Sequence, residues 1–444
     1  MHFTGSIMKD PLPRRALRGS LFALAVTLAP AAIAALAIAA PAQAAESGDW
    51  VGTWAASAQP VWDADFFLPS NAPRTLRDQT VRQVARVSVG GNKVRIVVSN
   101  EYGGAPMLLG AAGVGLSAGG SALKAGSAKP VTFGGQPSIT VPAGARVVSD
   151  PVDVAVPPLG SLAVSLYFPE VTPTTTWHWD GAQTGYISAA GNAVAEADFK
   201  PGATTLARLF LTEILVDATP DTRAVVFYGD SITDGAASTA DANHRWPDIL
   251  AERLNKAGAK VAVINEGISG ARILRDRMGV NALARFDRDV LSQPHADTVV
   301  LMMGINDIGW PDTILVPKGE VAPSAEDVIA GYKQLIAQAH MKKMRIVAAT
   351  LTPFEDTFHG GPLFGYYSEA KEAKRQSINQ WIRSGGAFDG VIDFEAATKD
   401  AANPKHMKAE FDSGDHLHPN DAGYKAMAEA VDLTLLGVKY SNPG

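Results

Sequence analysis

The stretch DSGDHLHPNDAGY, residues 412–424, contains residue types that could do acid–base chemistry, with two aspartates and two histidines within positions 412–418. An imidazole beside a carboxylate can act as a general base, because the carboxylate orients the ring and stabilises its protonated form. Two other interpretations are open. Asp, Gly, Asn and Pro also build ordinary turns, and a His-x-His pair flanked by aspartates could bind a metal. The function of this stretch therefore depends on what the rest of the chain supplies.

A candidate nucleophile follows the apolar run AVVFY at 224–228. The motif YGDSITDG (228–235) places Ser231 on a tight turn after a strand. There the hydroxyl would be exposed and the Ser231 N–H could face a bound anion. A helix N-cap is the alternative interpretation of this serine. The G-x-S-x-G elbow of α/β-hydrolases does not fit, because Thr233 occupies the position of its second glycine.

Two further turns could bind a developing negative charge. In NEGISGARI (265–273), Gly270 would let the backbone approach a ligand and donate an N–H, or would simply form a turn. In GINDIG (304–309), the Asn306 amide could donate to an oxyanion or could form an Asx-turn. Each motif alone is weak evidence, but all of them follow successive apolar runs of one predicted sheet.

Alternating strand-like and helix-like segments must position these side chains. The apolar runs lie at 224–228, 261–265, 298–303, 345–350 and 391–394. The helix-like segments lie near 245–257, 280–292, 324–341, 368–383 and 420–435. Repeated strand–helix units predict a parallel sheet that helices cover on both faces. In such sheets the active site lies beyond the carboxyl ends of the strands, which is where the four motifs fall.

Residues 46–216 have a different pattern and predict an antiparallel β-sandwich of the jelly-roll type. TVRQVARVSVGGNKVRIVVSNEYG (80–103) alternates apolar and polar residues around Gly90-Gly91, which is typical of a hairpin. Residues 138–170 repeat short Val-rich runs broken by Pro, Gly and Asp. The segment VDATPDTR (216–223) is a plausible linker to the second part.

The motif order resembles a known hydrolase superfamily. G-D-S-I, N-x-G-x-S-G, G-x-N-D and D-x-x-H-P stand in this order over about residues 222–436 and are similar to the blocks of SGNH (GDSL) hydrolases. The resemblance implies a flavodoxin-like three-layer α/β/α hydrolase domain with a parallel sheet. It is less specific for the N-terminal part, which is similar to a β-sandwich that precedes the hydrolase domain in some secreted members. The predicted division is 1–44, 45–218 and 219–444.

The resemblance also implies the roles of the candidate residues. Ser231 would be the nucleophile, His418 the base and Asp415 its orienting carboxylate, with Gly270 and Asn306 joining the Ser231 N–H as oxyanion donors. Asp415 and His418 are three positions apart, so one turn of a compact loop can bring them together.

The neighbouring His416 lies directly after Asp415, and adjacent side chains tend to diverge. Pairing of Asp412 with His416 is geometrically possible, but the resemblance assigns that pair no role. We therefore expect His416 to be a neighbouring or substrate-side residue. A catalytic zinc would want three protein ligands, and no further His cluster accompanies a strand end, so we expect no metal and no cofactor.

Composition excludes several other classes. The 444 residues include no Cys, which excludes disulfides and a thiol nucleophile. Residues 1–44 combine a basic start, an apolar run at 20–40 and the small-residue end Ala42-Gln43-Ala44, which is typical of a cleaved signal peptide rather than of a membrane anchor. Its removal changes the formal net charge from −6 to −9. We expect an exported, periplasmic or extracellular protein that does not bind nucleic acid.

The expected activity is carboxylic ester hydrolysis through an acyl-enzyme. Two aromatic segments bear on the substrate: TTTWHWDGAQTGY (174–186), whose rings could stack on sugars or pack in the core, and TPFEDTFHGGPLFGYY (352–367), which could shape the pocket. With export, they favour O-acetyl groups on a carbohydrate. Lipid or aryl esters are the alternative, and a carbohydrate-binding module with an inert hydrolase domain is the alternative of another class.

Overall fold

The computed structural model describes residues 49–63, 66 and 68–438. The described residues belong to one compact unit. The predicted signal peptide, 1–44, lies outside the described residues, so its assignment stays a prediction. In the described part of the chain, no helix is both long enough and apolar enough to cross a bilayer.

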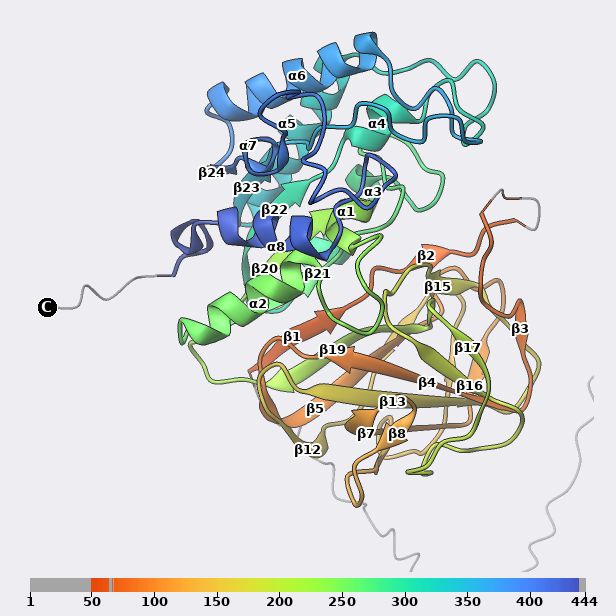
Figure 1. The fold of residues 1–444 in the computed structure, drawn as a ribbon. Coiled ribbons are helices and arrows are strands. Elements are labelled where there is room, and N and C mark those ends of the chain that lie inside the picture. The colour runs from red at the N-terminus through yellow and green to blue at the C-terminus, as the bar shows by residue number, and fades with distance from the viewer. Residues whose placement is uncertain (1–48, 64–65, 67, 439–444) are drawn as a thin grey trace, which may run out of the picture. The chain divides into compact units, whose positions relative to one another are not determined.

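A five-stranded parallel sheet forms the C-terminal part, in the order β21-β20-β22-β23-β24 (Figure 1). The strands are β20 (Arg223–Gly229), β21 (Val261–Asn265), β22 (Ala296–Met302), β23 (Arg345–Ala349) and β24 (Gly390–Ile392). Numbered along the chain, this order is 2-1-3-4-5, as in flavodoxin-like sheets. Strands of this kind are continuous apolar runs because both of their faces are buried, and all five strand predictions are confirmed.

Helices alternate with the strands of this sheet along the chain. They are α1 (Ser231–Asp234), α2 (Trp246–Lys256), α3 (Ala282–Phe286), α4 (Ile305–Gly309), α5 (Ala325–Met341), α6 (Glu369–Ser384), α7 (Phe394–Thr398) and α8 (Asp421–Ala430), with a π-turn at Asp287–Leu291 and a 3₁₀ turn at Leu433–Leu436. Alternate residues of β20 belong to different clusters. Phe227 packs with side chains of α2 and α8, whereas Val226 shares a cluster with side chains of α3, α5 and α6. Each of the five predicted helical segments contains at least one of these helices.

The N-terminal part is rich in antiparallel β-strands. One sheet contains β1 (Trp50–Ala55), β19 (Leu211–Asp217), β5 (Gly91–Ser99), β11 (Arg146–Val148) and β12 (Val152–Val156). Another contains β17 (Pro201–Thr205), β16 (Gly185–Ser188), β4 (Gln79–Arg86), β13 (Ser161–Phe168), β7 (Ala111–Gly119), β8 (Ala122–Leu123) and β9 (Lys129–Val131). Shorter pairings join β10 (Ile139–Val141) to β6 (Met107–Leu109), β14 (Thr172–Pro173) to β3 (Thr75–Leu76), and β15 (Thr176–His178) to both β18 (Arg208–Leu209) and β2 (Gln59–Pro60). Apolar residues of both larger sheets, such as Val94 and Val164, join one hydrophobic cluster.

The predicted hairpin at Gly90-Gly91 is wrong. β4 ends before Gly90 and β5 begins at Gly91, but the two strands lie in different sheets. β4 pairs with β13 and β16, and β5 pairs with β19, β11 and β12. The connection instead carries the chain from one sheet to the other. A Cβ at Gly90 would lie 2.4 Å from the carbonyl oxygen of Val156, so the close approach of that segment requires glycine. Alternating apolar residues indicate a strand with one buried face, but they do not identify the partner strand.

The two parts meet along β1 and β21, which is one of the two edge strands of the parallel sheet. The Ser88 side chain, which also bonds Thr53, accepts a hydrogen bond from the N–H of Val263 in β21 at 3.0 Å. Residues 218–222 connect β19 to β20, and the predicted boundary at 218/219 falls in this connection. Apolar residues of the β-rich part and of the parallel sheet belong to the same cluster, so the two parts share a core.

A buried carboxyl group lies in this contact. Glu213 of β19 is 7% exposed, and its Oε1 has no hydrogen-bond partner among the described residues. Burial raises the pKa of Glu213 to about 7, although the charge of Arg146 opposes the change. An unfolded glutamate ionises near pH 4.3. The neutral folded carboxyl therefore contributes stability that is fully present below that pH and is lost as the pH rises through about 7.

The Glu213→Gln side chain is neutral at every pH, so its stability should not depend on the ionisation of this position. Relative to the wild type, we expect the free energy of unfolding of Glu213→Gln to increase from pH 5 to pH 8, by roughly 3 kcal/mol at most. Thermal midpoints of both proteins at the two pH values measure the effect. Glu410→Gln, at an exposed position, is the matched control and should not change the pH dependence. An identical pH dependence in the wild type and Glu213→Gln would contradict a neutral, buried Glu213.

Candidate active site

Ser231 stands at the carboxyl edge of the parallel sheet, directly after β20. The turn is tight: a Cβ at Gly229 would lie 2.1 Å from Thr233 Oγ1 and 2.6 Å from the carbonyl oxygen of Met302. Asp230 caps the following helix α1 by accepting a hydrogen bond from the N–H of Ile232 at 3.1 Å. Ser231 is therefore the first residue of α1 rather than its N-cap. The predicted tight turn after the strand is present, but Ser231 is 5% exposed, so the expectation of an exposed residue there is wrong.

The structure brings Ser231, His418 and Asp415 together. His418 Nε2 lies 2.8 Å from Ser231 Oγ, and His418 Nδ1 lies 2.6 Å from Asp415 Oδ2. The other carboxylate oxygen, Oδ1, accepts the N–H groups of Leu417 and His418 at 2.9 and 2.8 Å. Because Asp415 bonds the backbone as well as the ring, it fixes both the loop and the orientation of the imidazole. This arrangement can move a proton from the serine hydroxyl to Nε2.

The charges of the site favour the protonated imidazole. Burial alone would lower the pKa of His418, but the hydrogen bond to Asp415 and its charge, together with the charges of Asp230 and Asp180, raise it above the ordinary value. Burial alone would raise the pKa of Asp415, but the hydrogen bond from the His418 ring, its charge and the two backbone donors hold it well below the ordinary range. Asp415 is therefore ionised at neutral pH, and His418 is a stronger base than a free histidine.

A second aspartate–histidine pair lies beside the first. His416 Nδ1 is 2.6 Å from Asp412 Oδ2, and the His416 N–H donates to Asp412 Oδ1 at 3.1 Å. His416 has a φ of +62°, which turns the backbone between the two histidines. Its ring lies 6.4 Å from that of His406, which bonds Glu355. Within the described part of the chain, the Ser231 hydroxyl bonds His418 and not His416, so the two pairs are not equivalent.

Gly270 and Ser231 each offer a backbone N–H. Neither N–H has an acceptor among the described residues. Gly270 has a φ of +76°, and a Cβ there would lie 2.2 Å from Met278 Sδ and 2.7 Å from the Trp310 ring. Glycine is therefore required at this position both by the backbone conformation and by the packing.

Asn306, in the first turn of α4, has a fixed amide orientation. Its Oδ1 accepts hydrogen bonds from Trp310 Nε1 at 2.7 Å and from the Tyr366 hydroxyl at 2.8 Å. Its Nδ2 donates to the carbonyl of Ala271 at 3.0 Å, which leaves one amide hydrogen for another acceptor. Two donors on Oδ1 exclude the flipped amide. The carbonyl of Ala271 follows Gly270, so Asn306 also ties α4 to the glycine turn.

Sequence reasoning missed the residues that hold this site. Tyr366, which orients Asn306, gave no signal because it lies 60 positions away in the chain. Trp310 also orients Asn306 and lies four positions after it, so the spacing of one helical turn was a signal that could have been used. Asp234 was visible as the second aspartate of GDSITDG but was given no role. His178 is buried and stands between two tryptophans in the sequence of the 174–186 segment. Its side chain lies 2.9 Å from that of Asp234. Trp177, one of the rings that could stack on a sugar or pack in the core, is 1% exposed and packs in the core.

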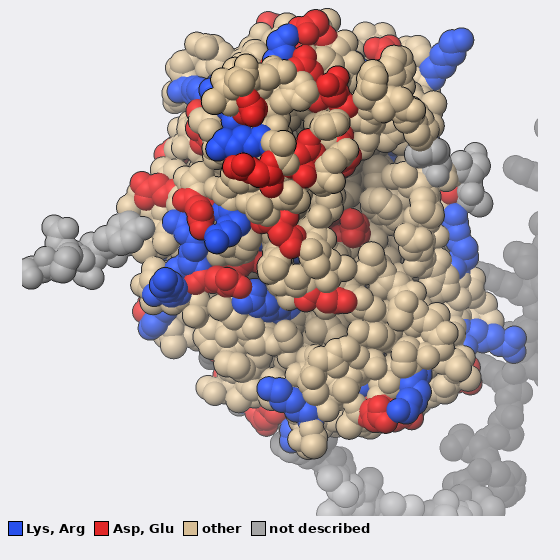
Figure 2. Space-filling model, viewed as in Figure 1, with Lys and Arg blue, Asp and Glu red and all other residues tan. Residues whose placement is uncertain are grey.

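The 352–367 loop lies against the histidine loop. The Phe358 N–H donates to the carbonyl of Asp415 at 3.2 Å, and Thr357 Oγ1 donates to the carbonyl of His416 at 2.9 Å. The Phe358 and His418 ring centroids are 6.4 Å apart. Figure 2 shows acidic side chains, interspersed with basic ones, over the part that contains α6 to α8, whereas the β-rich part carries fewer charged side chains on this face. No group of three or more His, Asp or Glu side chains in the described part could hold a metal ion.

Residues 225–431 match the family model described as GDSL-like lipase/acylhydrolase. The chain carries a GDSL-like lipase/acylhydrolase domain. It is a carboxylic ester hydrolase. The GDSL-like domain contains Ser231, Gly270, Asn306, Asp415 and His418, and its match ends one residue after α8.

Several solved structures are similar to the GDSL-like part. An acetyl xylan esterase is 21% identical, covers 47% of this chain and 96% of its own, and has a TM-score of 0.35. A lipase/acylhydrolase from Enterococcus faecalis is 21% identical, covers 47% and 93%, and has a TM-score of 0.36. A GDSL-like lipase from Bacteroides thetaiotaomicron is 17% identical, covers 48% and 88%, and has a TM-score of 0.35. No curated protein matches the chain in sequence.

We expect the His418 imidazole to titrate above pH 6.5, the value of a free histidine, because the carboxylate of Asp415 stabilises its protonated form. NMR titration of the histidine side chains measures the midpoint directly. Asp415→Asn should lower it, whereas the matched change Asp421→Asn, which removes a carboxylate from His244 instead, should not. A midpoint at or below 6.5, or one that is unaffected by Asp415→Asn, would contradict this coupling.

Proposed function

We propose that the protein is an exported serine esterase in which Ser231 is the nucleophile, His418 the general base and Asp415 the residue that orients it. One observation carries the proposal: the 2.8 Å hydrogen bond between Ser231 Oγ and His418 Nε2, backed by Asp415 at 2.6 Å. The N–H groups of Ser231 and Gly270 and the remaining amide hydrogen of Asn306 are the proposed oxyanion donors.

In the acylation step, Ser231 Oγ attacks the ester carbonyl carbon while its proton moves to His418 Nε2. The carbonyl oxygen gains the negative charge, which the three donors stabilise, and the C–O bond to the alcohol then breaks. The protonated His418 gives its proton to the departing alcohol oxygen, so the imidazole is neutral again. In the second step His418 takes a proton from water, whose oxygen attacks the acyl carbon. The bond between the acyl carbon and Ser231 Oγ then breaks, and His418 returns the proton to Oγ, which releases the acid and regenerates Ser231.

O-acetyl groups on a carbohydrate are the substrates that we propose. Acidic side chains surround the site: Asp415 bonds the base, and Asp180 lies close enough to raise the pKa of His418. A negative environment disfavours anionic esters such as phospholipids and suits neutral acetylated sugars. The 352–367 loop beside His418 would form part of the pocket wall.

A lipid or aryl ester is the second candidate, because the same loop exposes an apolar ring: Phe364 is 68% exposed. The inert-module alternative is weaker, since the hydrogen bonds from Ser231 to His418 and from His418 to Asp415 are both present. We further infer that 1–44 is removed on export, that the hydrolase domain has the three-layer α/β/α arrangement, and that the β-rich part is a jelly-roll-like sandwich that accompanies it.

We expect the protein to hydrolyse p-nitrophenyl acetate faster than the butyrate and octanoate, and to release acetate from an acetylated polysaccharide, because the leaving alcohol rather than a long acyl chain would supply the recognition. A fluorophosphonate probe should label Ser231 alone, and Ser231→Ala should remove both labelling and turnover. Activity that survives in Ser231→Ala would contradict the nucleophile. Preference for the octanoate would favour the lipid alternative.

The two histidines of 412–424 should respond differently to substitution. His418→Ala should lower kcat by roughly 10⁴-fold or more, because the serine then has no base. His416→Ala, the matched control on the adjacent pair, should change kcat by less than about fivefold, since His416 does not contact Ser231. Steady-state kinetics of both variants, with and without EDTA, measure this. Equal losses, or inhibition by EDTA that zinc reverses, would instead favour a metal site.

A further inference from the structure

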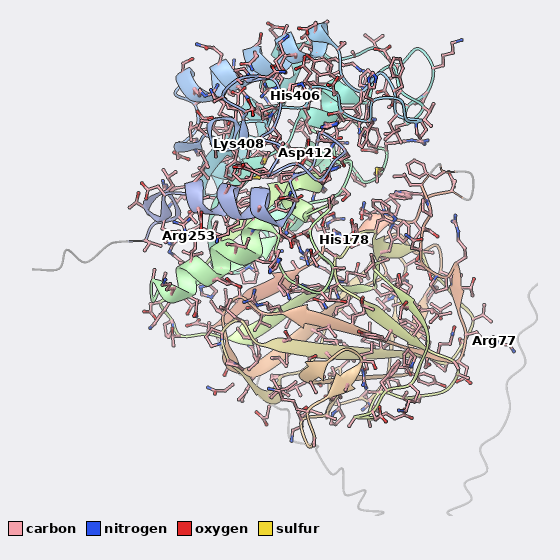
Figure 3. The ribbon with its side chains drawn as sticks, viewed as in Figure 1. Arg77, His178, Arg253, His406, Lys408 and Asp412 are labelled. Carbon is pink, nitrogen blue, oxygen red and sulfur yellow. The ribbon has the colours of Figure 1, made fainter. Side chains whose placement is uncertain are left out.

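A buried histidine of the β-rich part contacts the hydrolase domain beside the active site. The His178 side chain, at the end of β15, is 4% exposed. Its Nδ1 lies 3.0 Å from the carbonyl oxygen of Ser57, and its Nε2 lies 2.9 Å from Asp234 Oδ1. Figure 3 shows His178 where the β-rich part meets the GDSL-like domain. The two contacts tie three distant segments of the chain together.

Both ring nitrogens of His178 face acceptors. A carbonyl oxygen has no proton to give, so Nδ1 must donate to Ser57, and a carboxylate requires Nε2 to donate as well. Burial alone would lower the pKa of His178, but the charge and hydrogen bond of Asp234 and the Ser57 carbonyl raise it. Arg245, which donates to the carbonyl of Asp234, partly opposes this. His178 and Asp234 therefore form a buried ion pair.

Asp234 also bonds the turn that contains Gly270. Its second oxygen, Oδ2, accepts the N–H of Ser269 at 2.9 Å and the Ser269 hydroxyl at 2.8 Å. Ser269 directly precedes Gly270, the proposed oxyanion donor. The turn is also pressed against α1, since a Cβ at Gly267 would lie 2.4 Å from the N atom of Asp234. One carboxylate thus links the helix that begins with Ser231 to the turn that presents the Gly270 N–H.

We propose that His178 is a positioning residue for the oxyanion site: it holds Asp234, and through Asp234 and Ser269 it sets the position of the Gly270 N–H. The β-rich part therefore completes the catalytic centre and is more than an appended module. This inference rests on the proposed function. Oxyanion donors act only within a narrow range of distances, and misplacement by about 1 Å, even from a distant change, can cost on the order of 100-fold in rate.

A matched pair of substitutions separates the two ring nitrogens. In His178→Gln, the amide nitrogen can replace Nε2 and still donate to Asp234. In His178→Asn, the amide nitrogen corresponds to Nδ1 and can reach only Ser57. Both variants remove the same charge from the same buried site, so the loss of folding stability should be similar. A purely structural role would make their kinetics similar too.

We expect His178→Asn to lower kcat for p-nitrophenyl acetate by roughly 10- to 100-fold with KM within about twofold, because the oxyanion forms only after binding. His178→Gln should recover most of kcat. The affinity of a trifluoromethyl ketone, whose hemiketal oxygen occupies the oxyanion site, should fall in parallel with kcat. Asp234→Ala should lower kcat in the same way, and His178→Asn added to it should cause little further loss.

Ser88→Ala is the control, because Ser88 also joins the β-rich part to the hydrolase domain but bonds β21 instead. It should lower the thermal midpoint without changing kcat. Equal kcat values for the folded Asn and Gln variants, or an unchanged kcat in folded Asp234→Ala if His178→Asn does not fold, would overturn the inference while leaving the esterase activity of the wild type intact. A wild type without turnover would instead contradict the proposed function itself.

Discussion

The hydrogen bond between Ser231 and His418 joins residues 187 positions apart, and much of the described fold serves to hold it. A serine hydroxyl loses its proton readily only when an oriented imidazole lies within hydrogen-bond distance. The parallel sheet places Ser231 at the end of β20 and Asn306 just after β22, its neighbour, at the point where the strand order reverses. Asp415 then fixes His418 through bonds to both its ring and its backbone. In the proposed mechanism, the rate then also depends on where the oxyanion donors of Ser231, Gly270 and Asn306 lie.

Much of this arrangement could be predicted from the sequence, because its information is local. Buried parallel strands are apolar runs, helices have caps and periodic faces, and the four motifs follow strand ends in order. Asp415 and His418 share one turn, so their contact follows from their spacing. The roles of Ser231, Gly270 and Asn306 came instead from the resemblance to SGNH hydrolases.

What could not be predicted depends on contacts between distant residues. The Gly90-Gly91 connection has the pattern of a hairpin, yet β4 and β5 pair with strands far away in the chain. His178 and Asp234 are 56 positions apart, and neither pattern nor composition indicates that one faces the other. An isolated histidine between two tryptophans is also consistent with ordinary core packing, and Trp177 does pack in the core. Fold class and local motifs were thus accessible, whereas the supporting shell of the site was not.

The contact between β1 and β21 also limits how the chain can be divided. β21 is one of the two edge strands of the parallel sheet, and the Ser88 hydroxyl bonds the N–H of its central residue, Val263. A fragment that began at residue 219 would leave that edge, and the apolar residues that β1 covers, open to solvent. Bare strand edges recruit other chains, so such a fragment would tend to self-associate. The hydrolase domain of this protein should consequently not be stable as an isolated domain. Fusing it to another protein would require a segment that covers the β21 edge in place of the β-rich part.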